Sequence, residues 1–262
     1  MSSVIDRRSV LAGFALLGLR ACAGNSATGT VMVAAASDLQ YAIAEVIALF
    51  GKETGIDVRL SLGSTGNFAR QIREGAPFEL FMTADESFIF DLARLGLARD
   101  QGALYGIGRI VVKVPGGSVL AADGTLESLR AALAQGRIRR FAIANPEHAP
   151  YGKRAEEALR HAGLWDAIQP FLVMGENVAQ VAQFALSGNA DGGIIAYSLA
   201  LAPDLAARGT HALIPENWHQ PLRQRMALLR GAGPEAETFY RFIQTPSARA
   251  IMQRYGFSVP TG

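Results

Sequence analysis

The stretch that constrains the fold most is Val31–Phe50, VMVAAASDLQYAIAEVIALF, which predicts a strand, a tight turn and a helix. The first six residues are apolar and include two β-branched valines, which favours a strand buried on both faces. From Leu39 onward the apolar residues recur at helical spacing along one face. Ser37 or Asp38 is expected to cap this helix. A helix that begins at the carboxyl end of a parallel strand presents free N–H groups, so the pattern predicts half of an anion-binding cleft.

The rest of the chain alternates between strand and helix patterns. Strands are predicted at 56–62, 80–82, 109–114, 140–144, 171–174, 192–196, 211–214 and 225–229. Helices are predicted at 68–74, 88–95, 126–135, 153–162, 178–186, 234–243 and 247–255. Alternation of this kind is typical of parallel sheets covered by helices. The predicted fold class is α/β, with two doubly wound lobes joined by two crossovers.

The predicted division gives residues 30–112 plus 212–262 to the first lobe and residues 113–211 to the second. The chain of 262 residues is half hydrophobic, which is enough for one large core or two smaller ones. The crossovers are expected near residues 109–115 and 211–215. Two lobes joined in this way enclose a cleft and can move about a hinge of few residues.

Composition excludes several classes of function. Charged residues make up 18% of the chain and the net charge is +2, which is too little to indicate a nucleic-acid partner. The four histidines are scattered and no pair has the spacing of metal ligands, so no cation site is predicted. Cys22 is the only cysteine, which excludes a disulfide within the chain. No G-x-S-x-G elbow occurs, and the chain is predicted not to be an enzyme.

Residues 1–29 are expected to be an export signal and tether rather than part of the fold. Arg7 and Arg8 precede the short apolar run SVLAGFALLGL, which is typical of a secretory signal. The sequence DRRSVL also resembles the twin-arginine signal. A cleavage site is expected after Ala23. Residues 19–22 resemble a lipoprotein box in which Cys22 would be acylated, so the protein is expected in the periplasm, either free or lipid-anchored.

Six segments of the mature chain carry a resemblance to a known family. They are AAAS, GST followed by ARQI, GAPFELFMTAD, NPEHAPYG, GENV and the closing RYGF. Together they resemble the periplasmic molybdate-binding proteins of ABC importers over about residues 30–257. The resemblance implies a type II periplasmic binding fold, with molybdate or tungstate as ligand and no cofactor. It also implies a membrane permease and an ATPase as partners.

The family's ligand contacts fall on particular residues of this chain. The first serine falls on Ser37, the second on Ser64, the residue after proline in NPEHAPYG on Tyr151, and the backbone N–H donor on Val178. Some members add a tyrosine after the GGII-type strand, where this chain has Ala196 followed by Tyr197. Hydroxyl and amide groups are neutral donors that suit an oxyanion, which only accepts hydrogen bonds.

Asp38 departs from the family pattern, because many members have leucine directly after the serine. We favour the hypothesis that Asp38 points away from the ligand and bonds either the free amides of the helix that begins at Leu39 or a group across the cleft. In the alternative hypothesis Asp38 faces the ligand and accepts a proton from it, which would favour an oxyanion such as hydrogen phosphate. Two rival functions stay open at this stage: binding of phosphate or sulfate, and a secreted hydrolase that uses Ser37 or Ser64 with His148.

Overall fold

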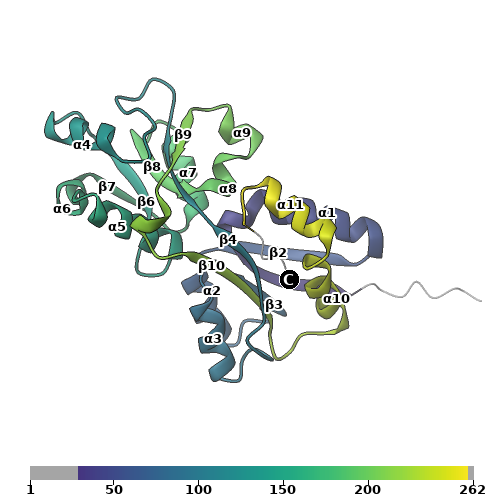
Figure 1. Ribbon diagram of the computed structural model, residues 1–262. Helices are drawn as coiled ribbons and strands as arrows, with labels where there is room; N and C mark the ends of the chain where they lie inside the picture. Colours follow the sequence, from purple (N-terminus) through teal and green to yellow (C-terminus); the bar gives the residue numbers. More distant parts are fainter. Residues whose placement is uncertain (1–28, 259–262) are drawn as a thin grey trace, which may run out of the picture.

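A computed structural model describes residues 29–258, and it shows two α/β lobes side by side (Figure 1). Each lobe contains one five-stranded sheet. The first sheet has the order β2-β1-β3-β10-β4, formed by β1 (Thr30–Ala36), β2 (Asp57–Gly63), β3 (Leu80–Thr83), β4 (Ala103–Gly108) and β10 (Leu222–Leu228). The second has the order β7-β6-β8-β5-β9, formed by β5 (Ile110–Val114), β6 (Phe141–Ala144), β7 (Leu172–Gly175), β8 (Gly192–Ala196) and β9 (Thr210–Leu213). The predicted export signal and Cys22 lie outside the described residues.

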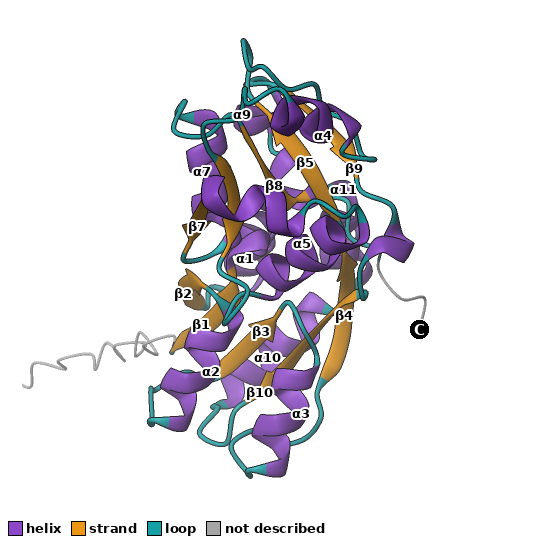
Figure 2. Cartoon of the chain, turned by 90° about the vertical axis from the view of Figure 1, so that its left-hand side faces the viewer, coloured by secondary structure: helices purple, strands orange, loops and turns teal. Residues whose placement is uncertain are grey.

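The helices pack around these sheets, and Figure 2 shows the two lobes one above the other. The first lobe carries α1 (Gln40–Thr54), α2 (Thr65–Arg73), α3 (Ser87–Arg94), α10 (Pro234–Ile243) and α11 (Pro246–Arg254). The second carries α4 (Glu127–Ala134), α5 (Pro150–His161), α6 (Trp165–Ile168), α7 (Val178–Leu186), α8 (Tyr197–Ala200) and α9 (Pro203–Ala206). Three short 3-10 helices complete the set: η1 (Ser37–Leu39), η2 (Gln169–Phe171) and η3 (Glu216–Trp218). Within the described residues no helix is both long and apolar enough to span a membrane.

The alternation of side chains along β1 explains how the first sheet is covered on both faces. Val31, Val33 and Ala35 pack in one core with α1, α10 and α11, whereas Ala34 packs in a second core with α2 and α3. Successive strand residues point to opposite faces, so a strand that is apolar throughout needs a helical layer on each side. The prediction of a doubly buried strand at Val31–Ala36 is therefore confirmed.

The sheets are mixed rather than wholly parallel. The pairs β1–β2, β1–β3, β6–β7 and β6–β8 are parallel, as expected. However, β10 runs antiparallel to β3 and β4, and β5 runs antiparallel to β8 and β9. These antiparallel strands include those through which the chain passes between the lobes.

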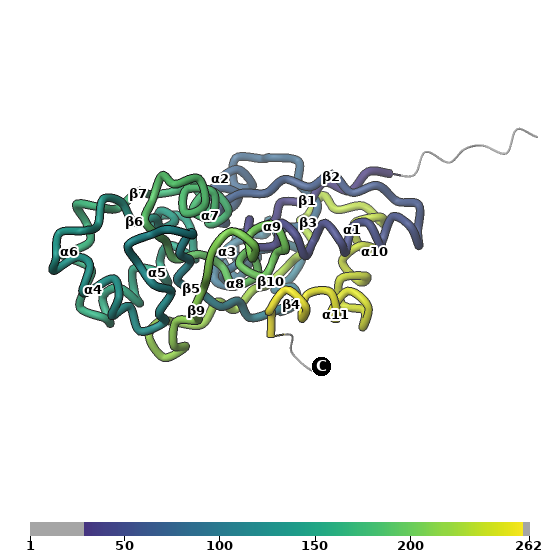
Figure 3. Tube along the Cα trace, turned by 90° about the horizontal axis from the view of Figure 1, so that it is seen from above, coloured from purple at the N-terminus to yellow at the C-terminus, as the bar shows by residue number. Residues whose placement is uncertain are grey.

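Figure 3, seen from above, shows the second lobe with α4, α5 and α6 at one end and the first with α1, α10 and β2 at the other.

The chain crosses between the lobes next to β5 and β9 rather than within them. The chain leaves the first sheet at Gly108 and enters the second at Ile110, and it leaves β9 at Leu213 and returns at Leu222. The predicted boundaries at 112/113 and 211/212 fall inside β5 and β9. These two strands pair with each other in the second sheet, so both belong wholly to the second lobe. We therefore propose lobe limits at residue 109 and within 214–221. The edge strand β4 is absent from the sequence prediction.

Candidate functional site

A small cavity of about 10 Å³ lies where the two lobes meet. Its walls come from the ends of β1 and β2 and the start of α2 in the first lobe, and from the starts of α5 and α7 in the second. The lining residues are Ala36, Ser37, Asp38, Gly63, Ser64, Thr65, Ala84, Ala149, Pro150, Tyr151, Asn177 and Val178. The structure therefore brings together all four residues that the resemblance implies, together with Asp38. No Lys, Arg or His is among these lining residues.

Ser37 connects the end of β1 to the start of α7. Its hydroxyl oxygen accepts a hydrogen bond from the Ala179 N–H at 3.3 Å, across the gap between the lobes. The side chain of Asn177 caps α7 by accepting from Ala179 and Gln180, both at 3.1 Å. Val178 is the first residue of this helix, so its N–H belongs to the set that helix geometry leaves without an intrahelical acceptor. The predicted cap of α1 by Ser37 is wrong, because its hydroxyl is engaged with the other lobe.

Ser64 lies at the start of α2 and also contacts the second lobe. Its hydroxyl caps α2 by accepting from the Asn67 N–H at 3.4 Å. The same oxygen lies 2.8 Å from His148 Nδ1 and 3.1 Å from the His148 carbonyl oxygen. His148 Nε2 lies 3.6 Å from Glu176 Oε2, and the Asn67 side chain donates to the same carboxylate group. This chain of polar contacts joins the loops before α5 and α7 to the start of α2.

Asp38 is almost completely buried and is held by residues that are distant in sequence. Its Oδ2 atom accepts one hydrogen bond from the Tyr151 hydroxyl at 2.9 Å and another from Gln224 Nε2 at 2.6 Å. The Asp38 carbonyl oxygen accepts from the Ser198 hydroxyl at 2.7 Å. The side chain of Asp38 makes no cap on α1, whose N-terminal cap has no side-chain bond. Both cap predictions are therefore wrong, because the polar partners of Ser37 and Asp38 come from other elements. The other expected partner of Asp38, a group across the cleft, is present as Tyr151.

Burial raises the pKa of Asp38 to about 7. This effect exceeds the opposite effect of the hydrogen bonds from Gln224, Tyr151 and its own backbone N–H, which lower the pKa. The pKa of Tyr151 is raised well above its usual value, mainly by burial and then by the charge of Asp38. The pKa of Tyr105 is raised well above its usual value by the same two causes in the same order. Both tyrosines are therefore neutral hydrogen-bonding groups at physiological pH.

Two residues of the network have no counterpart in the sequence prediction, namely Gln224 and Tyr105. The Tyr105 hydroxyl lies 2.9 Å from Gln224 Oε1 and 2.9 Å from the Thr83 carbonyl oxygen. Gln224 lies on the buried face of β10 between Leu222 and Met226, two residues from each. A polar residue at an inward position of an alternating strand is the signal that could have found it.

Tyr197 is not among the residues that line the small cavity. Its backbone N–H donates to the Arg109 carbonyl oxygen at 2.9 Å, and its ring lies 5.7 Å from that of His211. It therefore helps to join α8 to the crossover into β5. The structure does not bring Tyr197 together with the other predicted site residues.

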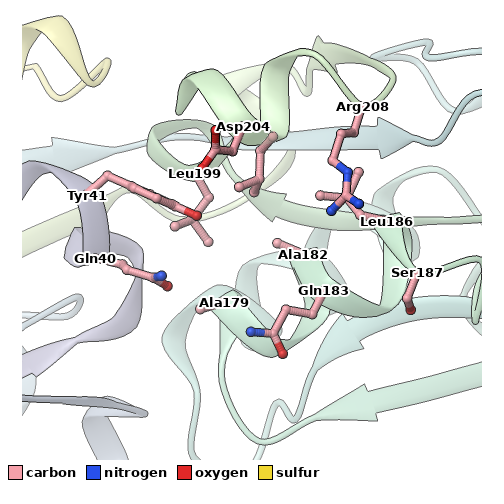
Figure 4. Close-up of a pocket in the computed structure, with 11 residues that line it drawn as sticks. Gln40, Tyr41, Ala179, Ala182, Gln183, Leu186, Ser187, Leu199, Asp204 and Arg208 are labelled. Atoms are coloured by element: carbon pink, nitrogen blue, oxygen red, sulfur yellow. The ribbon is translucent and has the colours of Figure 1, made fainter.

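A larger cavity of about 400 Å³ lies between α1 and the second lobe (Figure 4). Tyr41 and Gln40 reach it from α1, while Asp204 and Arg208 border it on the second lobe. Burial, followed by the charge of Asp204, raises the pKa of Tyr41. The larger cavity carries one carboxylate, Asp204, and one guanidinium group, Arg208, and none of the residues that the resemblance implies for the ligand.

The chain matches the family model described as bacterial extracellular solute-binding protein over residues 31–258. It is 33% identical to the molybdate-binding protein ModA of Escherichia coli strain K12, over 91% of this chain and 93% of that protein. It is 31% identical to ModA of Rhodobacter capsulatus, over 88% and 89%. The solved periplasmic molybdate-binding protein of Azotobacter vinelandii superposes with a TM-score of 0.79 at 29% identity, over 88% of this chain and all of that one.

These matches confirm the resemblance seen in the sequence motifs and the predicted two-lobed fold. They also weigh against the hydrolase, although the structure places Glu176 beside His148 as the third polar group that such an enzyme would need. The matched family consists of solute-binding proteins, and the chain is a binding protein rather than an enzyme. From residue 31 to residue 258 the chain belongs to the bacterial extracellular solute-binding protein family.

Proposed function

We propose that this protein captures molybdate, or tungstate in the same way, in the small cavity between its lobes. It would then deliver the ion to an ABC permease and its ATPase. The observation that carries the proposal is the meeting of neutral donors from both lobes at one cavity, namely the hydroxyls of Ser37 and Ser64 and the N–H of Val178. The relatives named as molybdate-binding proteins supply the choice of ion.

The donor set suits a fully deprotonated tetrahedral oxyanion. Such an ion accepts hydrogen bonds and donates none, so it needs hydroxyl and amide groups turned toward it. A hydrogen bond to a charged group contributes about 1.5–3 kcal/mol, so several converging bonds can offset the cost of removing the ion from water. A positive side chain is not required, and the start of α7 adds a favourable partial charge.

Each hydroxyl can be assigned a direction of donation. The Ser37 oxygen accepts from Ala179, which leaves its proton free for the ligand. The Ser64 hydroxyl donates to the His148 carbonyl oxygen at 3.1 Å, so its proton has to turn from that acceptor to the ligand, while His148 Nδ1, 2.8 Å away, can donate to the Ser64 oxygen. The Tyr151 hydroxyl donates its single proton to Asp38, so we propose that Tyr151 acts on the ligand through Asp38.

Location and partners follow from the family rather than from the site. Extracellular solute-binding proteins work outside the cytoplasmic membrane, and we propose that the N-terminal segment exports this one to the periplasm by the twin-arginine route. A lipid on Cys22 would anchor it there. In support, one relative from Bacillus subtilis, 27% identical over 87% of this chain and 86% of that protein, is described as a putative ABC transporter substrate-binding lipoprotein.

Isothermal titration with molybdate, tungstate, sulfate and phosphate near neutral pH tests the proposal. We expect one site per chain for molybdate and tungstate and far weaker binding of sulfate. The variant Ser37→Ala should weaken binding, whereas Ser247→Ala on the exposed start of α11 should leave it unchanged. Sulfate binding as tightly as molybdate would overturn the choice of ion.

Phosphate is the second candidate ligand, because Asp38 lines the cavity and a carboxylate favours an oxyanion that carries a proton. A competition titration between phosphate and molybdate separates the two. If phosphate displaces molybdate from the wild type and loses this advantage in Asp38→Asn, the ligand is a protonated oxyanion.

A further inference from the structure

The two carboxyl oxygens of Asp38 have different surroundings. Oδ2 accepts hydrogen bonds from Tyr151 and Gln224, whereas Oδ1 is buried and has no hydrogen-bond partner among the described residues. The residue is 1% exposed and lines the small cavity together with the proposed donors. Buried polar atoms are almost always hydrogen-bonded, so an unpartnered carboxyl oxygen at a ligand cavity indicates a partner supplied by the ligand.

The network around Asp38 decides which oxygen can carry a proton. The Tyr105 hydroxyl is within hydrogen-bonding distance of Gln224 Oε1. With its oxygen on that side, the Gln224 amide turns its Nε2 atom toward Asp38 and toward the Tyr151 oxygen, 3.0 Å away. Gln224 and Tyr151 then both donate to Oδ2. Because Oδ2 already accepts two hydrogen bonds, a proton on the Asp38 carboxyl belongs on Oδ1. The neutral acid would therefore donate from Oδ1, the oxygen that has no partner within the protein.

No cation pairs with Asp38 among the described residues. The titratable groups that contact it or its network are Tyr151 on α5 and Tyr105 on β4. The other elements packed against η1 contribute Tyr41 and Glu45 on α1 and Tyr197 on α8, whereas α7 has no titratable residue. Lys52 and Glu53 of α1 are exposed in its last turn, away from η1. Among the charged groups of β10 and α5, Arg223 and Arg225 pair with Glu86, Arg154 with Asp85 and Glu157, and Arg160 with Glu156. Lys153 is exposed, and His161 stacks on Trp218. His148 contacts Ser64.

An ionised Asp38 beside a dianion would repel it strongly at this burial, since little water separates the two charges. A neutral carboxyl group removes this repulsion and adds one more donor. Burial already brings the pKa of Asp38 to about 7, so a proton can be taken up from neutral solution at small cost. Geometry and charge thus lead to the same protonation state for the occupied site.

We propose that Asp38 Oδ1 shares one proton with an oxygen of the bound oxyanion, so that the protein takes up one proton with each dianion that it binds. The inference rests on the proposed oxyanion function. In balanced form, the carboxylate, one proton from solvent and the dianion give a carboxyl group hydrogen-bonded to the dianion. A hydrogen oxyanion meeting the carboxylate gives the same complex, with the same single proton between the two oxygens.

Titration calorimetry with molybdate from pH 7.5 to 9.5 tests this proposal, in pairs of buffers that differ in ionisation enthalpy. The wild type should take up about one proton per ion, and its dissociation constant should rise about tenfold per pH unit once Asp38 is ionised in the free protein. Asp38→Asn keeps a donor that does not titrate, so it should show no uptake and a nearly constant dissociation constant. Asp57→Asn, at an exposed position of β2, should behave as the wild type.

His148 is the other titratable group near the donors, and His148→Gln should retain the proton uptake. Molybdate binding without proton uptake by the wild type would overturn the sharing of a proton while leaving the oxyanion function intact. Failure of every oxyanion to bind the wild type at any pH would instead overturn the proposed function. If Asp38→Asn does not fold, as judged by its thermal transition, the proton count of the wild type decides the question alone.

Discussion

Replacement of Ser64 by alanine should weaken oxyanion binding far more than it weakens the fold. The Ser64 hydroxyl lines the cavity at the N-cap of α2, and its loss removes one hydrogen bond to a charged ligand, about 1.5–3 kcal/mol. At 1.4 kcal/mol per factor of ten, the dissociation constant should rise about 10- to 150-fold. The cap on α2 is also lost. Its bond to Asn67 is long, at 3.4 Å, so the cost in stability should lie near the lower end of about 0.5–2 kcal/mol.

The assay is titration calorimetry of wild type, Ser64→Ala and the exposed control Ser247→Ala with molybdate at one pH and salt concentration. Urea unfolding of the same three proteins measures the stability term separately. An unchanged dissociation constant in Ser64→Ala, with the small loss of stability still present, would show that Ser64 is only a helix cap. A similar loss of affinity in the control would show that the assay reports on folding rather than on the site.

Three further predictions follow from the same contacts. The folded-state pKa of Asp38 lies above its unfolded value of 3.8, so its contribution to stability is fully present below about pH 4 and is lost as pH rises to about 7. Ligand-free wild type should therefore lose on the order of 4 kcal/mol relative to Asp38→Asn over that range in urea unfolding, and parallel profiles would contradict this. Gly108→Ala should destabilise the protein by about 1–3 kcal/mol, because its Cβ would lie 2.4 Å from the Tyr151 hydroxyl, whereas Gly116→Ala in open space should unfold like the wild type. Small-angle scattering should show compaction when molybdate saturates the protein, since contacts such as Ser64–His148 form between the lobes; an unchanged radius of gyration would refute closure.

Local patterns in the sequence were sufficient for much of the fold. The predicted spans of α7, β8 and α10 coincide with the observed ones, because their apolar spacing and flanking turn residues agree with each other. The strand β4 was missed since ALYGIG contains two glycines, which are uncommon in strands, and its pairing partner β10 lies more than a hundred residues away. The start of α5 was placed late because NPEHAPYG resembles a turn, although Pro150 occupies the first helical turn.

Part of the site can likewise be predicted from local motifs, and part depends on contacts between residues far apart in the sequence. The motifs identified Ser37, Ser64, Tyr151 and Val178, and all four line one cavity. The surroundings of Asp38 were beyond local inference, since Tyr151 is 113 residues away and Gln224 is 186 residues away. A short polar side chain before a helix is commonly a cap. Only the three-dimensional fold shows that two distant donors bind this carboxyl instead.

The most direct test of the central claim is a crystal structure with molybdate, with diffraction recorded at the molybdenum absorption edge to locate the ion. We predict one anomalous peak per chain in the small cavity, within hydrogen-bonding reach of the Ser37 and Ser64 hydroxyls and the Val178 N–H. A peak in the larger cavity beside Tyr41 and Arg208, or no peak between the lobes in crystals saturated with molybdate, would contradict the proposed site.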